Sequence, residues 1–435
     1  MSQGDGNGII GAIDVSRETN LLLKEGTFMK KVFDIVIIGG GAAGLVAGIE
    51  AKTQNASLEV AVLEQESRVG KKLLVTGNGR CNLTNKGGLQ GRYYGDVAFA
   101  QAGFEAFGVD ETVNWMERHG ISSVELEEGK VYPRSLQAGS VVDQLRFALE
   151  EAGVQLFSER GVTAIEKENP FVLHTSSGVI YGKKVLVATG GKSGLKPNQK
   201  ANGYDLLKSL GHTHTPLYPA IVQITTNKEP IRPLKGIKVN GYVTAQTPKG
   251  ERKEWGEILF TEYGISGPPV LQVSSLLSQN NGGKVVLDVV PDLSFSEIKE
   301  EIARRCKGFP NRTCEELLTG FINKRLGQTL VKLAGVDKLS RLCGSLSSKE
   351  QSAIAGMCKK FVLDVTGTNG WQQAQVTGGG MNTNEFSPVT MESKKVKGLY
   401  AAGEVLNVTG DCGGFNLQWA WTSGILAGRA MAKGE

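Results

Sequence analysis

The sequence predicts an α/β fold in which a domain built on a parallel sheet is split by a long insertion. Residues 32–38 form an apolar run rich in β-branched side chains, a glycine-rich turn and a helical segment follow, and a second apolar run occupies 58–63. This order of strand, helix and strand is typical of parallel sheets covered on both faces. Strand patterns return near Val362, after a strand-and-turn segment and a charged helical segment. We therefore expect the C-terminal part to rejoin the first domain.

The turn between the first two strands has the spacing of a nucleotide-binding fingerprint. Gly39, Gly41 and Gly44 fit GxGxxG, and the next strand ends on an acidic residue, Glu64, twenty positions after Gly44. The first glycine makes the tight turn, the second lets the backbone approach a pyrophosphate, and the third permits close helix–strand packing. The N–H groups at the helix start, around Ala43, attract a phosphate. We expect Glu64 to accept hydrogen bonds from an adenosine ribose, as in a Rossmann-type domain.

The C-terminal segment favours FAD over NAD as the resident cofactor. The sequence contains one complete fingerprint, since the glycines at 190–191 and 378–380 lack the strand, helix and acidic residue around them. Gly403 and Glu404 follow a predicted strand, and Gly414 precedes a helix expected at about 415–433. That helix would direct a second N-terminus into the crevice, where its dipole stabilises negative charge on a reduced flavin.

A loop at 77–85, GNGRCNLTN, concentrates small residues, amides and one cation. Arg80 is expected to pair with a phosphate, and Asn78 and Asn82 to hydrogen-bond the flavin ring or its ribityl chain. A self-capping surface loop is the alternative interpretation.

These segments resemble the YhiN/BaiN-like bacterial FAD-dependent oxidoreductases. The similar motifs are the GRCNxTN run within 71–85, YPRS at 132–135, LFTEYGISGP at 259–268, and the segment 403–421. The resemblance spans about 32–430 and implies an FAD-bound oxidoreductase with a β-rich and a helical insertion. Members are described as NAD(P)/FAD-dependent, some as reductases of steroid-like enones and others as aminoacetone oxidases. The segment at 189–198 departs from the usual family pattern.

The fingerprint and the resemblance together give a set of predicted cofactor-binding residues spread along the chain. They are Gly39, Gly41, Ala43, Gly44, Glu64, Lys72, Thr76, Gly77, Asn78, Gly79, Arg80, Cys81, Asn82, Val162, Thr189, Gly190, Gly403, Glu404, Gly414, Asn416, Leu417 and Gln418. The sequence identifies no catalytic acid or base.

Changes in amino-acid composition and in strand and helix patterns along the chain predict the domain organisation. Residues 1–28 are expected to be a disordered or non-native extension, because the first strand begins shortly after Met29. The FAD-binding domain is expected at 29–195 and 361–435. The insertion is expected to comprise a β-rich subdomain at 196–293 and a helical subdomain at 294–360.

Composition narrows the class of protein and its compartment. The chain has a net charge of +5, with basic residues spread along it, and no apolar run long enough for a membrane span. The six cysteines form no CxxC pair, so we expect neither a metal site nor a disulfide framework. So few cysteines in a chain of this length favour a reducing compartment, and we expect a cytoplasmic protein. Nucleic acid is an unlikely partner on this reading.

Individual polar residues allow more than one interpretation. Cys81 and Cys412 are expected to be structural rather than redox-active. His212 and His214 are expected to be hydrogen-bonded structural residues. Tyr218, Glu262 and Tyr263 lie in segments of the insertion expected to cap the flavin, and either bind or protonate substrate or serve only the domain interface. Of Trp419 and Trp421, which face opposite ways on the last helix, at least one is expected to pack in the core.

We therefore predict hydride transfer between flavin N5 and a small organic substrate, with NAD(P)H as a possible transient reductant. Two alternatives stay open. One is an oxidase that acts on amines or aminoketones and uses O2, and the other is an RNA-associated, tRNA-modifying flavoprotein. The sequence leaves the substrate and the oligomeric state open.

Overall fold

The computed structural model describes residues 31–195 and 202–434. The chain divides into two units, Met1–Lys31 and Val32–Glu435, and the second carries all the elements described below. The predicted N-terminal extension, 1–28, lies outside the described residues.

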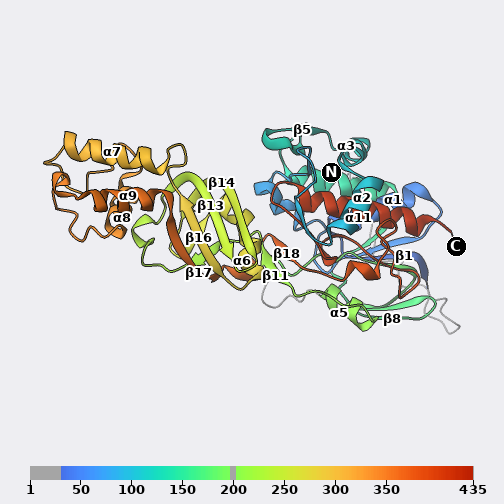
Figure 1. The fold of residues 1–435 in the computed structure, drawn as a ribbon. Coiled ribbons are helices and arrows are strands. Elements are labelled where there is room, and N and C mark those ends of the chain that lie inside the picture. The colour runs from blue at the N-terminus through green and yellow to red at the C-terminus, as the bar shows by residue number, and fades with distance from the viewer. Residues whose placement is uncertain (1–30, 196–201, 435) are drawn as a thin grey trace, which may run out of the picture. The chain divides into compact units, whose positions relative to one another are not determined.

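A mostly parallel sheet forms the centre of the first domain (Figure 1). Strand β1 (Val32–Ile38) pairs in parallel with β2 (Val60–Leu63) on one side and with β10 (Gly178–Val187) on the other, and β19 (Leu399–Ala401) pairs in parallel with β10. Because β19 comes from the C-terminal part of the chain, the predicted split domain is confirmed. Along the sheet the strands are β7 (Gln155–Phe157), β2 (Val60–Leu63), β1 (Val32–Ile38), β10 (Gly178–Val187), β9 (Phe171–Thr175) and β8 (Val162–Glu166), with β19 (Leu399–Ala401) beside β10.

Helices α1 (Ala42–Gln54) and α11 (Phe415–Ala432) pack closely against each other over this sheet. Glycines make the approach possible, because a Cβ at Gly424 would lie 2.3 Å from the carbonyl oxygen of Ala43. One turn later Gly428 meets Ala47 in the same way, at 2.6 Å. Since both numbers rise together, the two helices run in the same direction. The other helices of this domain are α2 (Val97–Ala106), α3 (Val109–Arg118), α4 (Ala138–Glu151), α5 (Asn202–Ser209) and α10 (Gly370–Gln373).

The β-rich insertion is a closed barrel, flanked by one helix, α6 (Pro268–Gln279). Its strands in order around the barrel are β12 (Ile224–Thr226), β15 (Gly264–Ser266), β14 (Gly250–Phe260), β13 (Lys238–Thr247), β16 (Gly283–Asp288) and β17 (Phe361–Thr368). The last strand corrects the predicted boundary at 361. Strand β17 pairs with β16 and β12, so residues 361–368 close the barrel before the chain returns to the first domain.

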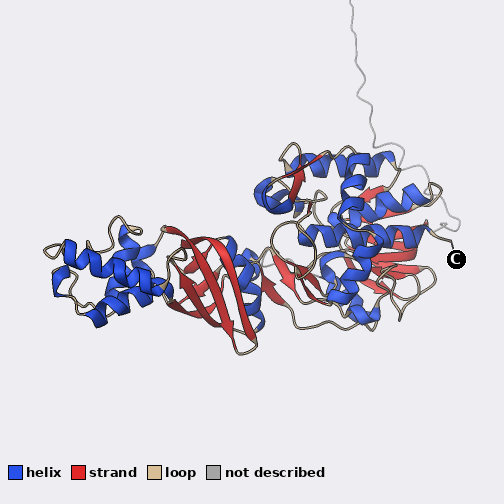
Figure 2. Ribbon diagram, turned by 45° about the horizontal axis from the view of Figure 1, so that its top comes forward, coloured by secondary structure: helices blue, strands red, loops and turns tan. Residues whose placement is uncertain are grey.

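The helical insertion contains α7 (Phe295–Gly308), α8 (Lys324–Leu333) and α9 (Ser348–Lys359), which Figure 2 shows in blue next to the barrel strands. These helices and the barrel share one apolar core, in which Ile302 and Leu330 of the helices join Val243 and Phe260 of the strands. The two predicted subdomains therefore fold as a single packed body.

Short strand pairs complete the structure. Strand β11 (Tyr218–Ala220) pairs with β18 (Val376–Gly378), and β20 (Val408–Gly410) pairs with β4 (Tyr93–Gly95). A third small sheet has the order β3 (Thr84–Asn85), β6 (Lys130–Pro133) and β5 (Ser123–Glu125). No described helix is long and apolar enough to cross a bilayer.

Candidate functional site

The fingerprint turn has the geometry that its glycines require. Gly39 has φ +107° and donates its N–H to the carbonyl of Leu63 at 2.8 Å, which ties the turn to β2. A Cβ at Gly44 would lie 1.9 Å from the carbonyl oxygen of Gly39, so only glycine permits this packing. A Cβ at Gly41 would meet nothing within 4 Å, and no side chain caps the helix that starts there. The start of α1 is thus an open helix N-terminus.

The carboxylate of Glu64 holds the same turn. It accepts hydrogen bonds from the N–H of Gly40 and the N–H of Glu66, both at 2.8 Å. Burial raises its pKa, although these bonds act in the opposite direction. A carboxylate has about four lone-pair sites, so acceptor capacity for ribose hydroxyls remains.

The 77–85 loop is built from left-handed backbone positions. Gly77, Asn78, Gly79 and Cys81 have φ between +56° and +79°, and Thr76 fixes the preceding turn by donating its hydroxyl to the carbonyl of Leu73 at 2.7 Å. At 79–81 the right-handed Arg80 lies between two left-handed residues, a pattern that can turn successive N–H groups toward an anion. The guanidinium of Arg80 lies 4.8 Å from the centroid of the Tyr132 ring.

An ion-pair cluster joins this loop to the other glycine-rich segments. Lys72 Nζ donates to Glu404 Oε2 at 2.8 Å and to Ser193 Oγ at 2.7 Å. The same carboxylate accepts from the N–H groups of Gly191 and Thr377, at 3.1 and 2.7 Å. Burial alone would raise the pKa of Glu404, but Lys72 and these hydrogen bonds lower it overall. Glu404 thereby brings together four segments that are far apart in the sequence.

The start of α11 lies against the same loop. Gly414, the N-cap, has φ +100°, and a Cβ there would lie 2.6 Å from the carbonyl oxygen of Thr84 and 2.8 Å from Asn82 Oδ1. No side chain caps this helix and no acidic residue occupies its first turn. Two uncapped helix N-termini, those of α1 and α11, therefore belong to predicted cofactor segments.

Three buried oxygen atoms near these segments have no hydrogen-bond partner: Asn82 Oδ1, Thr189 Oγ1 and the hydroxyl of Tyr204. Asn82 lies beside Gly414, and Thr189 follows β10. Burial raises the pKa of the Tyr204 hydroxyl, and the nearby carboxylate of Glu404 raises it further. Buried polar atoms are normally satisfied, so unpaired ones at a common site fit a polar cofactor that hydrogen-bonds them.

Other predicted cofactor residues serve the fold. The side chain of Asn416 bonds the backbone of Gly410 in both directions at 2.8 Å. The buried Gln418 accepts from the hydroxyl of Thr84 and donates to those of Thr112 and Thr422. Since both amides are committed to protein partners, the structure gives no support to cofactor contacts through them.

The remaining predicted cofactor positions are glycines with left-handed backbone and buried or partly buried apolar side chains. Gly403 has φ +75°, and a Cβ added there would lie 3.2 Å from the Cβ of Ala43. Val162 is buried at the start of β8, Gly190 has φ +71° beside Glu404, and Leu417 is partly buried in the first turn of α11. These positions shape the backbone around the crevice.

Cys81, Cys412 and the two tryptophans of α11 are buried or partly buried, as expected for structural residues. Cys81 is fully buried in the core, and burial raises the pKa of its thiol to about 12. Burial also raises the pKa of the Cys412 thiol. Trp419 and Trp421 are both buried and donate their indole N–H groups to the carbonyls of Gly403 and Leu83.

The histidines and the candidate acids also have clear partners. His212 is buried, with Nδ1 2.8 Å from Glu385 Oε2, and His214 Nδ1 lies 2.7 Å from the carbonyl oxygen of Thr215. Among the described residues no group of His, Cys, Asp and Glu has the geometry of a metal site. Glu262 is exposed and pairs with Lys235 on the surface, whereas the ring of Tyr218 packs against Gly378.

A charged cluster that the sequence does not reveal lies between the barrel and the segment before α11. Arg252 of β14 donates to Asp411 Oδ1 at 2.9 Å and also bonds the hydroxyl of Tyr94. Asp411 is buried, and Arg92 approaches its other oxygen at 3.5 Å. Gln272 of α6 exchanges hydrogen bonds with the backbone N–H and carbonyl of Cys412. Nothing local in the sequence marks these partners, because they come from before, within and after the insertion.

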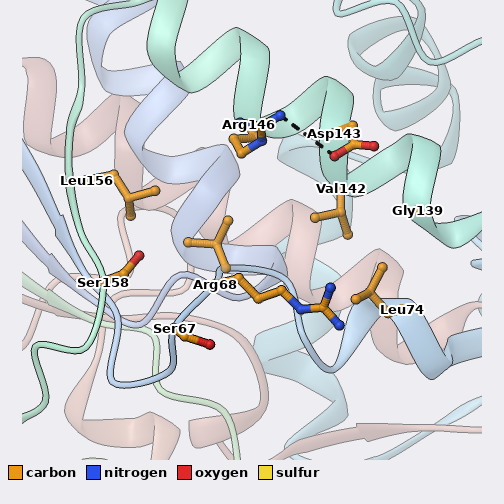
Figure 3. Close-up of a pocket in the computed structure, with 10 residues that line it drawn as sticks. Ser67, Arg68, Leu74, Gly139, Val142, Asp143, Arg146, Leu156 and Ser158 are labelled. Atoms are coloured by element: carbon orange, nitrogen blue, oxygen red, sulfur yellow. Dashed lines mark ion pairs between the residues drawn. The ribbon is translucent and has the colours of Figure 1, made fainter. Parts of the chain in front are cut away.

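A cavity of about 290 Å³ lies beside the turn that follows β2 (Figure 3). It lies between α4, which contributes Val142 and Arg146, and the turn after β2, which contributes Ser67 and Arg68. An ion pair of 3.9 Å joins Arg146 to Asp143 at its rim. None of the predicted cofactor residues lines this cavity, but Leu74 of its wall lies between Lys72 and Thr76, and Val69 packs against Gly40 of the fingerprint turn.

Comparison with known proteins identifies the family of this chain. Residues 33–430 match the family model described as the HI0933-like protein Rossmann domain. The chain belongs to this family. The resemblance to YhiN/BaiN-like proteins is thus confirmed, because the match covers almost the whole chain.

The HI0933-like chain has two informative relatives. It is 37% identical over 406 residues to a 3-dehydro-bile acid delta(4,6)-reductase of Clostridium scindens, with 92% of this chain and 99% of the relative covered. It is 32% identical over 396 residues to a ribosomal RNA dihydrouridine synthase of Escherichia coli, covering 90% and 96%. The prediction that this HI0933-like protein is a flavoprotein oxidoreductase is confirmed.

A solved structure that the chain resembles is the 3-ketosteroid-delta4-(5alpha)-dehydrogenase of Rhodococcus jostii RHA1. It has a TM-score of 0.47 and 17% identity, with 96% of this chain and 99% of that chain covered. At this level the likeness carries no inference about substrate.

Proposed function

We propose that this protein is an FAD-dependent reductase of carbon–carbon double bonds conjugated to a carbonyl group. When bound, FAD supplies hydride transfer at its N5 atom. NADH or NADPH is the proposed source of reducing equivalents, binding only transiently because the sequence has a single fingerprint. The observation that carries the FAD-binding part of the proposal is the spacing of the two uncapped helix N-termini.

This spacing follows from the parallel packing of α1 and α11. Gly424 lies opposite Ala43, at the start of α1, and α11 begins nine residues earlier at Phe415. At 1.5 Å per residue the second N-terminus lies about 14 Å beyond the first along the helix axis. This is comparable with the reach from a pyrophosphate through a ribityl chain to the far edge of an isoalloxazine ring. One helix end would hold the pyrophosphate and the other would stabilise negative charge on the ring.

The protein residues have distinct proposed roles. The fingerprint glycines and Ala43 bind the pyrophosphate, and Glu64 binds the adenosine ribose. Asn82 and Thr189 offer their unpaired oxygens to hydroxyl or N–H groups of the cofactor. Lys72 and Glu404 hold the surrounding loops in place. The start of α11 directs its N–H groups at the reacting end of the cofactor.

The substrate class rests on the names of the two relatives. A 3-oxo compound with 4,6 double bonds and a uracil base share one chemical feature, a double bond conjugated to a carbonyl. Reduction of such a bond adds a hydride at one carbon and a proton at the other. Both relatives are named for reductions, which favours a reductase over the oxidase alternative.

Anaerobic rapid mixing of the FAD-loaded protein with NADPH or NADH, and then with a cyclic enone or with uridine, tests the proposal. We expect the flavin to bleach on the first mixing and to recover on the second. Recovery with O2 alone, after reduction by an amine or aminoketone, would establish an oxidase instead. Absence of flavin binding would overturn the proposal altogether.

A further inference from the structure

The cavity beside the turn after β2 is lined by side chains that have no role in the proposed reaction. Its volume is about 290 Å³, and its walls come from α4, from the segment 67–74 and from residues 156–158 at the end of β7 (Figure 3). The lining has an aliphatic part and a polar part. The aliphatic part consists of Val69, Leu74, Val142 and Leu156, and the polar part consists of Ser67, Arg68, Asp143, Arg146 and Ser158. A ligand that contacts both parts is amphipathic.

One face of α4 is turned toward the cavity. Gly139, Val142, Asp143 and Arg146 have the spacing of residues that share one side of a helix. Gly139 leaves free space at the first turn, because a Cβ added to it would meet nothing within 4 Å. The helix therefore forms one wall of the cavity, and that wall has room for a bound molecule.

The polar part carries an excess of positive charge. Within the described part of the chain Arg68 is exposed and forms no hydrogen bond or ion pair. Arg146 is only loosely paired, at 3.9 Å, with Asp143. Figure 3 shows the guanidinium of Arg68 on the side of Leu74 and that of Arg146 beside Asp143. Two guanidinium groups against one carboxylate attract an anion, and an unpaired guanidinium binds a carboxylate through two parallel hydrogen bonds.

The walls favour one kind of anion. None of the described residues that line the cavity is aromatic, so a nucleobase or another flat ring would have no stacking partner. Val69 and Val142 are buried and belong to the core of the domain, so the aliphatic wall is continuous with that core. A volume near 300 Å³ is at the lower end of the range of ligand pockets. These features fit a small anion with a flexible aliphatic chain.

We infer that this cavity binds a medium-chain aliphatic carboxylate and that the bound carboxylate strengthens the binding of FAD. The carboxylate group pairs with Arg68, and the chain lies against Val69, Leu74 and Val142. The second half of the inference rests on the proposed binding of FAD at the fingerprint turn.

The cavity wall is joined to the fingerprint turn by direct packing. A Cβ added to Gly70 would lie 2.9 Å from both methyl carbons of Val142, and Gly70 donates its N–H to the carbonyl of Gly40 at 2.8 Å. Val69 lies against the same turn, because a Cβ added to Gly40 would lie 2.5 Å from Val69 Cγ1. A ligand that fixes this wall therefore fixes the turn beside the proposed pyrophosphate site. By linkage, FAD strengthens the binding of the carboxylate by the same factor.

Titration calorimetry of the FAD-loaded full-length protein with sodium octanoate tests the site. Gly139→Leu fills the cavity from α4 and is expected to abolish binding. Gly356→Leu makes the same substitution in α9, where an added Cβ also meets nothing within 4 Å, and is expected to bind octanoate like the unchanged protein.

A second pair of variants tests the charge. Arg68→Gln is expected to weaken octanoate binding by about tenfold or more, because a charge-assisted hydrogen bond is lost. Arg118→Gln, at an exposed residue of α3, is the matched control and is expected to leave binding unchanged. Equal melting temperatures of the FAD-loaded variants show that they are folded, and Arg68→Gln alters only an exposed side chain.

Dilution of the loaded protein, followed by flavin fluorescence, measures the effect on FAD. Saturating octanoate is expected to lower the dissociation constant of FAD by about fivefold or more in the unchanged protein and not in Gly139→Leu. A dissociation constant that octanoate leaves unchanged overturns the inference. Competition between octanoate and FAD also overturns it, because the cavity would then belong to the cofactor site.

The two glycine variants decide whether octanoate occupies the cavity at all. Equal binding to Gly139→Leu and Gly356→Leu overturns the inference, since the ligand would then lie elsewhere. Neither measurement needs turnover. A protein that reduces enones without binding octanoate keeps the proposed function and loses this inference. A protein that binds both FAD and octanoate but reduces no enone keeps this inference and loses the proposed reaction.

Discussion

Lys72 and Glu404 form an ion pair of 2.8 Å across 332 residues of sequence. Lys72 lies just before the 77–85 loop, and Glu404 follows the last strand of the central sheet. The pair is only part of the bonding at this point, because two backbone N–H groups and Ser193 also donate to the carboxylate. The site's loops are therefore tied to one another through a single side chain.

Replacing this carboxylate should damage both stability and cofactor binding. In Glu404→Ala the donors of Gly191, Thr377 and Lys72 lose their acceptor together. Removing the shared acceptor from such a partly buried set typically costs about 2–3 kcal/mol. We expect urea unfolding to show a loss of that size and the purified variant to contain less FAD. Unchanged stability and FAD content would mean that the cluster has no organising role.

Gly414→Ala should displace the start of α11. The residue has φ +100°, and the added methyl would meet Thr84 and Asn82 at under 3 Å. FAD affinity is expected to fall by about tenfold or more, because strain of this kind costs roughly 1–3 kcal/mol. Gly356→Ala is the matched control, since an added Cβ there meets nothing within 4 Å. If both variants bind FAD equally well, the start of α11 is not near the cofactor.

Acid should destabilise the protein through Glu385. Burial would raise the pKa of this carboxyl, but hydrogen bonds from Lys395, Thr213 and His212 outweigh it and lower the pKa to about 2, from 4.5. A lowered pKa contributes stability that is complete above about pH 4.5 and is lost as the pH falls toward 2. Melting temperatures across this range should fall more steeply for the unchanged protein than for Glu385→Gln. Parallel curves would contradict the assignment.

The contact of Arg252 with Asp411 should stabilise the junction between the barrel and the first domain. Arg252→Met removes the nearer of the two cations beside the buried carboxylate of Asp411 and leaves Arg92 at 3.5 Å, so we expect a loss of about 3 kcal/mol. The double variant Arg252→Met/Asp411→Asn should recover part of this loss, because it removes the unpaired charge. A double-mutant cycle by urea unfolding measures the coupling. Strictly additive losses would show that the two side chains act independently.

Cys81 should be chemically inert in the folded protein. Its thiol is buried and its pKa is raised to about 12, so almost no thiolate exists at neutral pH. We expect iodoacetamide to label Cys81 only after denaturation, as measured by peptide mass spectrometry. Turnover of Cys81→Ala with FAD bound should equal that of the unchanged protein. Loss of turnover in that variant would give the thiol a redox role.

The sequence by itself determined the features that depend on neighbouring residues. The fingerprint turn, the buried strands around it and the helix at 415–432 obey local rules, since glycine spacing, apolar runs and helix starts act over a few residues. The same local character made the FAD-binding class and its glycine-rich loops predictable.

Only the tertiary structure decided which distant residues meet. The pairing of Lys72 with Glu404, the contact of Arg252 with Asp411, and the placement of β17 in the barrel all join segments separated by long stretches of chain. The hydrogen bonds of Gln418 to three threonines could not be predicted either, because the sequence around a glutamine does not show whether its amide faces a cofactor or the core. Such contacts depend on strand register and on the closing of long loops, and neither leaves a periodic signal in the sequence.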